Sequence, residues 1–134
     1  MTKGNFKILT CFVFSIIILL SCNKTQDNDQ CLSYIKASII KVEGPNKGTV
    51  NQEINFTVSF GCSNGCGQFG NFEQTSDNDT TTINVIAKYE GCNCTLDAPI
   101  RQTIYKFKAT QTGTYYLKFW QTDKSYLLDS LIIQ

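Results

Sequence analysis

The chain of 134 residues contains no histidine. Histidine is the usual general base for serine and cysteine nucleophiles, and it is the commonest metal ligand. Its absence therefore excludes Ser-His and Cys-His catalytic pairs and every His-ligated metal site. The single methionine is Met1, so no other thioether can help cysteines to bind Cu(I).

A strong net charge is lacking too: 12 basic and 11 acidic residues leave +1, and neither sign forms a block. This balance argues against a protein that binds nucleic acid through its charge. Paired carboxylates could hydrolyse a substrate without histidine, but the acidic residues form no recognisable pair. We therefore expect a non-enzymatic protein without a cofactor. A histidine-free hydrolase is the enzymatic alternative.

The sequence has one long hydrophobic run, residues 8–20, which lies near the start of the chain. These 13 residues fall short of the ~20 that a membrane-spanning helix needs. Lys3 and Lys7 precede the run, and a positive segment before a short apolar run is typical of an export signal.

The run ends at Leu19-Leu20-Ser21-Cys22, which resembles the lipobox of bacterial lipoproteins. The resemblance implies that residues 1–21 are a cleaved signal peptide and that Cys22 carries the lipid. Acyl chains on Cys22 would hold the protein at the bacterial cell envelope, on the periplasmic or surface side of the outer membrane. Residues 22–30 would then be the lipidated cysteine and a flexible polar tether.

Residues 31–134 contain enough apolar material for one folded domain, and apolar and polar side chains alternate along it with the period of two that predicts strands. Turn-forming clusters separate the alternating segments. An antiparallel β-sandwich of about seven strands follows from this spacing. The expected strands cover residues 34–42, 54–60, 69–74, 82–89, 105–108, 115–120 and 126–133.

The segment from Tyr105 to Phe119 resembles the corner between the fifth and sixth strands of immunoglobulin-like domains. In those domains a glycine-x-tyrosine step begins the sixth strand, and the tyrosine hydroxyl bonds back to the backbone. Gly113 and Tyr115 match that step. The resemblance implies an immunoglobulin-like sandwich without the antibody disulfide.

Seven cysteines are present, and five of them fall in the domain: Cys31, Cys62, Cys66, Cys92 and Cys94. In an immunoglobulin-like topology all five would gather at one end. Outside the cytosol disulfides are favoured, and two bridges between the loops around 62–66 and 92–94 would stabilise them. A four-cysteine zinc site and free or copper-binding thiols are the alternatives. Five is an odd number, so one thiol is left over.

The segments around Asn64-Gly65-Cys66-Gly67 and Cys94-Thr95 resemble small Bacteroidetes-type lipoproteins of uncharacterised function. This resemblance favours a Cys66–Cys94 bridge. Cys31, Cys62 and Cys92 would then compete for the second bridge.

Two aromatic residues, Tyr116 and Trp120, are expected to point outward from the strand at 115–120. With Ile86 and Ile104 they would expose an apolar surface of the kind that binds partners. We therefore expect a membrane-anchored binding module whose partner is an envelope protein or a glycan. The alternative is a metal- or redox-handling protein that uses the cysteines.

Overall fold

The computed structural model describes residues 31–134. The predicted signal peptide (1–21), Cys22 and the tether up to residue 30 lie outside the described residues. The described part is built from strands alone, and within it no helix is long and apolar enough to cross a membrane. The strands are β1 (Leu32–Ala37), β2 (Ile39–Glu43), β3 (Lys47–Gly48), β4 (Glu53–Gly61), β5 (Gly67–Asp77), β6 (Thr80–Glu90), β7 (Ile100–Lys108), β8 (Gly113–Thr122) and β9 (Ser125–Ile133).

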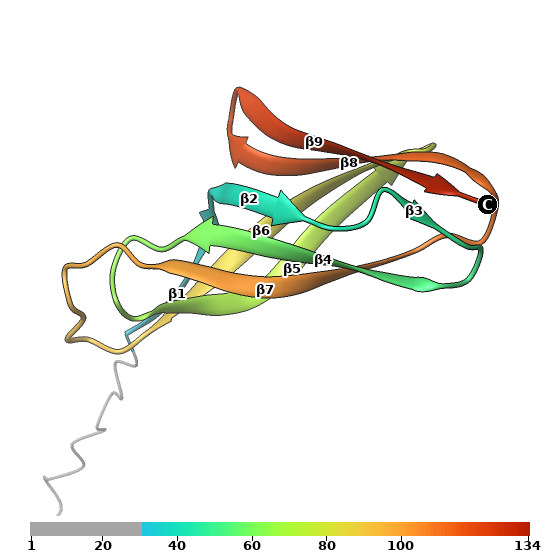
Figure 1. The fold of residues 1–134 in the computed structure, drawn as a ribbon. Coiled ribbons are helices and arrows are strands. Elements are labelled where there is room, and N and C mark those ends of the chain that lie inside the picture. The colour runs from blue at the N-terminus through green and yellow to red at the C-terminus, as the bar shows by residue number, and fades with distance from the viewer. Residues whose placement is uncertain (1–30) are drawn as a thin grey trace, which may run out of the picture.

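The nine strands form two sheets that face each other (Figure 1). The large sheet has six strands in the order β1-β6-β8-β9-β3, with β5 paired to β6 as well. The small sheet has three strands in the order β2-β4-β7. This arrangement agrees with the expected all-β sandwich.

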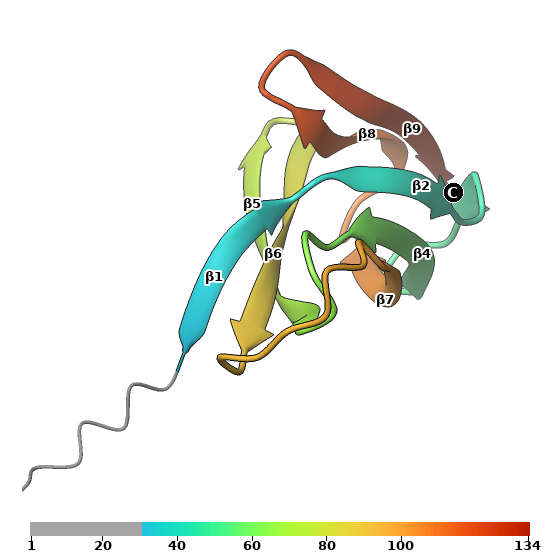
Figure 2. The same cartoon turned by 90° about the vertical axis from the view of Figure 1, so that its left-hand side faces the viewer.

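The expected first strand is divided between the two sheets. β1 pairs with β6 in the large sheet, and after Ser38 the chain continues as β2 and pairs with β4 in the small sheet. Figure 2 shows β1 and β2 as one ribbon that passes from sheet to sheet. This division and the short β3 raise the number of strands from about seven to nine.

The expectation of a wholly antiparallel fold is wrong for the large sheet. β6 runs parallel to β8, and β3 runs parallel to β9. The side of β6 that does not pair with β5 is shared: β8 pairs along Thr80–Ile83, and β1 pairs along Val85–Glu90. The alternation of apolar residues correctly predicted the strands, but it carries no information on which strands become neighbours.

Aromatic side chains connect the two sheets across the core. Phe56, Phe60 and Phe119 are fully buried. A chain of ring contacts crosses the sandwich from Phe56 to Phe119 and then to Tyr105, with centroid distances of 6.3 and 5.8 Å. Tilted and edge-on arrangements are the preferred geometry of aromatic pairs, so these contacts hold the two sheets against each other.

Candidate functional site

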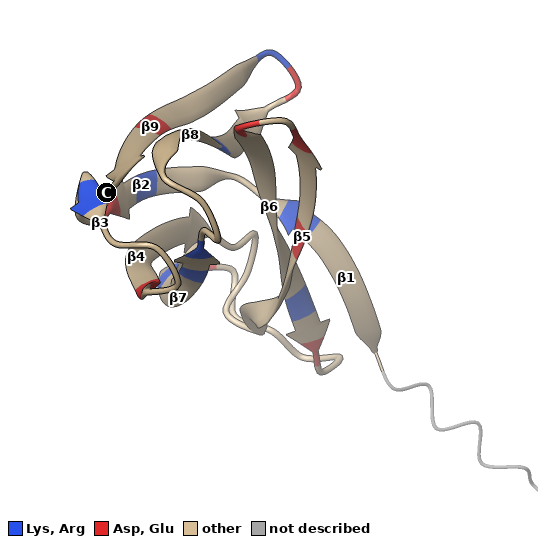
Figure 3. Cartoon of the chain, turned by 90° about the vertical axis from the view of Figure 1, so that its right-hand side faces the viewer, with Lys and Arg blue, Asp and Glu red and all other residues tan. Residues whose placement is uncertain are grey.

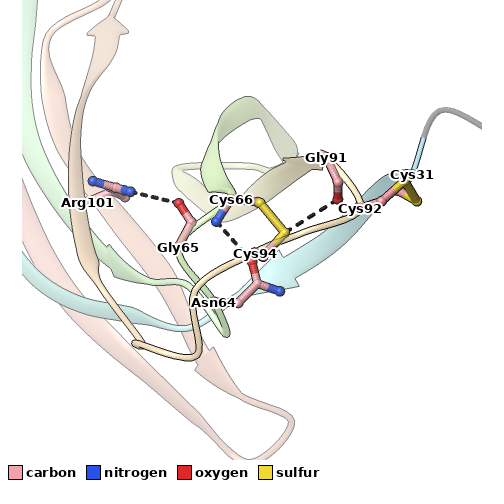
Figure 4. The surroundings of a disulfide bond; sticks show 8 residues. All are labelled: Cys31, Asn64, Gly65, Cys66, Gly91, Cys92, Cys94 and Arg101. Carbon is pink, nitrogen blue, oxygen red and sulfur yellow. Dashed lines mark hydrogen bonds between the residues drawn. A yellow bond between two sulfur atoms is a disulfide. The ribbon is translucent and has the colours of Figure 1, made fainter.

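Two disulfides join loops at one end of the sandwich (Figure 4). They link Cys31 to Cys92 and Cys66 to Cys94, with Cα–Cα distances of 5.0 and 5.4 Å. The second is the bridge that the resemblance favoured, and it ties the β4–β5 loop to the β6–β7 loop. The expectation that both bridges join these two loops is wrong, because the first one ties the chain just before β1 to the β6–β7 loop. We call this end of the molecule, with its five cysteines, the cysteine end.

The fifth cysteine, Cys62, is a buried free thiol. Its side chain lies against Gly67, where an added Cβ would be only 2.7 Å from the Cys62 sulfur. Burial raises the pKa of the Cys62 thiol, and a hydrogen bond with Tyr89 and the charge of Arg101 lower it by less. A buried, protonated thiol is a poor nucleophile, so Cys62 acts as a core residue.

Arg101 holds the β4–β5 loop in place. Its Nε donates to the Gly67 carbonyl at 3.1 Å. Its Nη2 donates to the Gly65 carbonyl at 3.2 Å, and this second bond is drawn in Figure 4. Tyr89 supports the same loop, because its hydroxyl accepts a hydrogen bond from the Ser63 backbone N–H at 2.9 Å. Neither role could be predicted from the residue pattern, since the partners are backbone groups far away along the chain.

A cleft of about 480 Å³ lies at the cysteine end. Its walls include Cys92 and Cys94, which contribute one cysteine to each disulfide. Tyr89 and the aliphatic side chains of Leu32, Ile35 and Leu96 also line it. Among residues 31–134, no group of three or more His, Cys, Asp or Glu side chains is placed to hold a metal ion. Four of the five sulfurs are consumed by the bridges, so the zinc and copper alternatives would require both bridges to be reduced.

The second candidate site is the outer face of the large sheet, by which we mean the face turned away from the small sheet. Tyr116 lies on it and is 52% exposed, and Trp120 lies on it half-buried. Ile86 shares this face, but Ile104 does not. Ile104 belongs to β7 of the small sheet, so the expectation that it extends the surface of Tyr116 is wrong.

Lysines accompany the aromatic residues of the outer face. The Lys36 ammonium lies 4.8 Å from the centre of the Trp120 ring, and the Lys118 ammonium lies 4.8 Å from that of Tyr126. Tyr34, on the same face of β1 as Lys36, is 57% exposed. Lys36 and Tyr34 could not be assigned to this site from the sequence, because β1 and β8 are about 80 residues apart and become neighbours by pairing with the same strand, β6.

Charges of both signs are interspersed over the strands in this region (Figure 3). Lys88 and Glu90 form an ion pair on the outer face of β6. Glu73 and Asp77 lie on β5, in register with Asn84 and Thr80 of β6. The outer face is therefore aromatic and weakly charged, and not a basic patch.

A comparison with protein-family models matches residues 56–126 to the ORF11 beta-sandwich domain. Searches of curated proteins and of solved structures gave no match. The matched residues run from β4 into β9 and include Cys62, Cys66, Cys92 and Cys94, together with Tyr116 and Trp120. More than half of the sequence is covered, and the chain therefore belongs to the ORF11 beta-sandwich domain family.

Proposed function

We propose that this protein is a lipid-anchored lipoprotein of the bacterial cell envelope that acts as a non-enzymatic binding module. The observation that carries the binding role is the outer face of the large sheet. Tyr116, Tyr34 and Leu128 are each more than half exposed there, beside Trp120 and Tyr126. An exposed surface of this kind is characteristic of partner binding.

The anchoring role rests on the sequence before residue 31. The lipobox ends at Cys22, and eight residues separate it from Cys31. An extended segment of that length reaches about 30 Å at most. The cysteine end, where Cys31 lies, would then stay near the lipid, and the far end of the sandwich with the C-terminus would point away from it (Figure 1).

We also propose that the sandwich is immunoglobulin-like. The order β2-β4-β7 of the small sheet corresponds to the first, second and fifth strands of that fold. The Tyr115 hydroxyl donates to the Gln111 carbonyl at 3.1 Å, as a tyrosine corner does. The parallel pairing of β6 with β8 departs from the antibody arrangement.

Capture from envelope extracts tests the binding role. The immobilised protein should enrich envelope material, protein or glycan, over an unrelated lipoprotein. Replacing two of the outer-face aromatic residues (Tyr116→Ser with Trp120→Ser) should remove that enrichment. Ile104→Ser is the matched control, because Ile104 is similarly exposed on the opposite sheet. Equal capture by all three proteins, or enrichment of nothing, would count against the proposal.

Lipid labelling tests the anchor separately. In cells grown with a radioactive or clickable fatty acid, the wild-type protein should incorporate the label. Cys22→Ala should abolish the label because the acceptor sulfur is gone. Cys11→Ala should keep it, since Cys11 lies within the expected signal peptide. A labelled Cys22→Ala product would refute the lipobox assignment.

A further inference from the structure

Five side chains on the outer face form a single row that alternates between aromatic residues and lysines. On the side of β6 that does not pair with β5, β8 supplies the first three and β1 supplies the last two. The order is Tyr116, Lys118, Trp120, Lys36 and Tyr34. Tyr116 lies opposite Thr80, and Tyr34 lies opposite Lys88. The row is therefore about 26 Å long, for a strand that rises roughly 3.3 Å per residue.

The contact of Lys36 with Trp120 makes the row continuous. Trp120 lies two residues before the end of β8, and Lys36 is the outward residue of β1 nearest to it. The Lys36 ammonium lies 4.8 Å from the centre of the Trp120 ring, so the side chains of the two strand ends meet on the outer face. Lys118 lies opposite Thr82 and Lys36 lies opposite Ile86, so their backbone positions are about 13 Å apart.

We infer that this row binds an extended acidic polysaccharide. The inference rests on the proposed binding function and names the class of ligand. Aromatic rings offer flat apolar faces on which the C–H faces of sugar rings can stack, and the lysines between them can pair with carboxylates. The row itself contains no acidic side chain, so a polymer with widely spaced acidic sugars meets cations and rings in turn.

The charges around the row disfavour a nucleic acid. A single strand carries a phosphate on every nucleotide, so its binding sites track the backbone with a continuous positive groove. Here Lys88 is already paired with Glu90, and Glu73 lies on the neighbouring β5. Residues 31–134 contain nine basic and nine acidic side chains, which gives a neutral domain. A sparsely charged polymer fits this balance better than a densely charged one.

Binding should change the surroundings of Trp120. A carboxylate that pairs with the Lys36 ammonium draws it away from the indole ring, and a sugar ring takes its place. Trp120 is the single tryptophan of the chain, so its fluorescence reports on the middle of the row.

The experiment is a fluorescence titration of the purified mature protein with three polysaccharides in which an acidic sugar alternates with a neutral one: hyaluronan, unsulfated chondroitin and heparosan. At least one of them should shift or quench the Trp120 emission until the signal saturates, and added salt should weaken the binding. Neutral dextran and single-stranded oligothymidylate should have little effect. Lys36→Gln and Lys118→Gln should each weaken binding about threefold, and Tyr116→Ala about tenfold. Lys106→Gln, on the small sheet, should not change it.

Three results would overturn the inference: no response to any of the three acidic polymers, equal binding by the Lys106→Gln and Lys36→Gln variants, or tighter binding of oligothymidylate. Unchanged thermal unfolding of Tyr116→Ala shows that the variant is folded. Envelope capture and Cys22 labelling do not depend on this titration, so either proposal can fail while the other stands. Capture of a protein alone by the outer face would support the binding function and reject the polysaccharide.

Discussion

Tyr105 is the buried residue whose ionisation is most strongly altered by the fold. Its ring contacts Phe72 and Phe119, and its hydroxyl donates to the Gln74 side-chain carbonyl at 2.8 Å. Burial raises the pKa of Tyr105 to about 12 from its ordinary value near 10. The neutral phenol is thus the form that the folded protein requires.

This raised pKa predicts a loss of stability at alkaline pH. Below about pH 10 the phenol is neutral in both states, and its full contribution is present. Between about pH 10 and 12 the unfolded chain ionises first, so the free energy of unfolding falls, by about 2 kcal/mol in total. Denaturant unfolding at several pH values measures this. Tyr105→Phe should show a shallower decline over that range, and an identical decline would contradict the assignment.

At the same scale, the sequence predicted some residues well and others not at all. Tyr115 could be assigned because a glycine two residues earlier marks a recurrent local turn, and its bond to Gln111 is local. Tyr116 and Trp120 could be assigned by alternation along one strand. Arg101 and Lys36 could not, because their partners, Gly65 and Trp120, are brought close only by the fold.

At the scale of elements, the two disulfides have different tasks. The Cys66–Cys94 bridge, 28 residues apart, ties two loops, and the Cys31–Cys92 bridge, 61 residues apart, holds the start of β1. β1 ends the large sheet on one side, with β6 as its only strand partner in the described part of the chain. Its start would otherwise be the part of the sheet most prone to detach.

Removing each bridge should therefore give different results. Replacing both Cys66 and Cys94 by Ala should lower the free energy of unfolding by about 3.6 kcal/mol, and replacing Cys31 and Cys92 should lower it by about 4.3 kcal/mol, because a longer closed loop restricts the unfolded chain more. Hydrogen exchange should show fraying of β1 only in the second variant. Cys62→Ala, which keeps both bridges, is the control. Rapid exchange of β1 in the wild type would contradict this role.

The elements themselves were largely predictable, but their neighbours were not. Alternation located β4 and β6 because each has one buried face. It missed the division at Ser38, since residues on both sides of the break continue the same extended chain. It also missed the parallel pairing of β6 with β8, which depends on how the β5–β6 hairpin packs against the rest of the sheet.

At the scale of the whole molecule, the features divide between the two parts of the sandwich. The cysteine end carries both bridges and the start of the described chain. The outer face of the large sheet carries the row from Tyr116 to Tyr34. In the proposed function, the cysteine end connects to the lipid anchor through residues 22–30, and the outer face presents a binding surface to the surroundings.

Mass spectrometry of the protein extracted from membranes, alkylated in denaturant without reduction, examines the lipid anchor and the two bridges together. The chain should begin at a diacylglycerol-modified Cys22 and gain one alkyl group, on Cys62. Peptide mapping should find the Cys31–Cys92 and Cys66–Cys94 bridges. An unlipidated chain with a different first residue, or a chain with four or more alkylated cysteines and bound zinc or copper, would contradict these assignments.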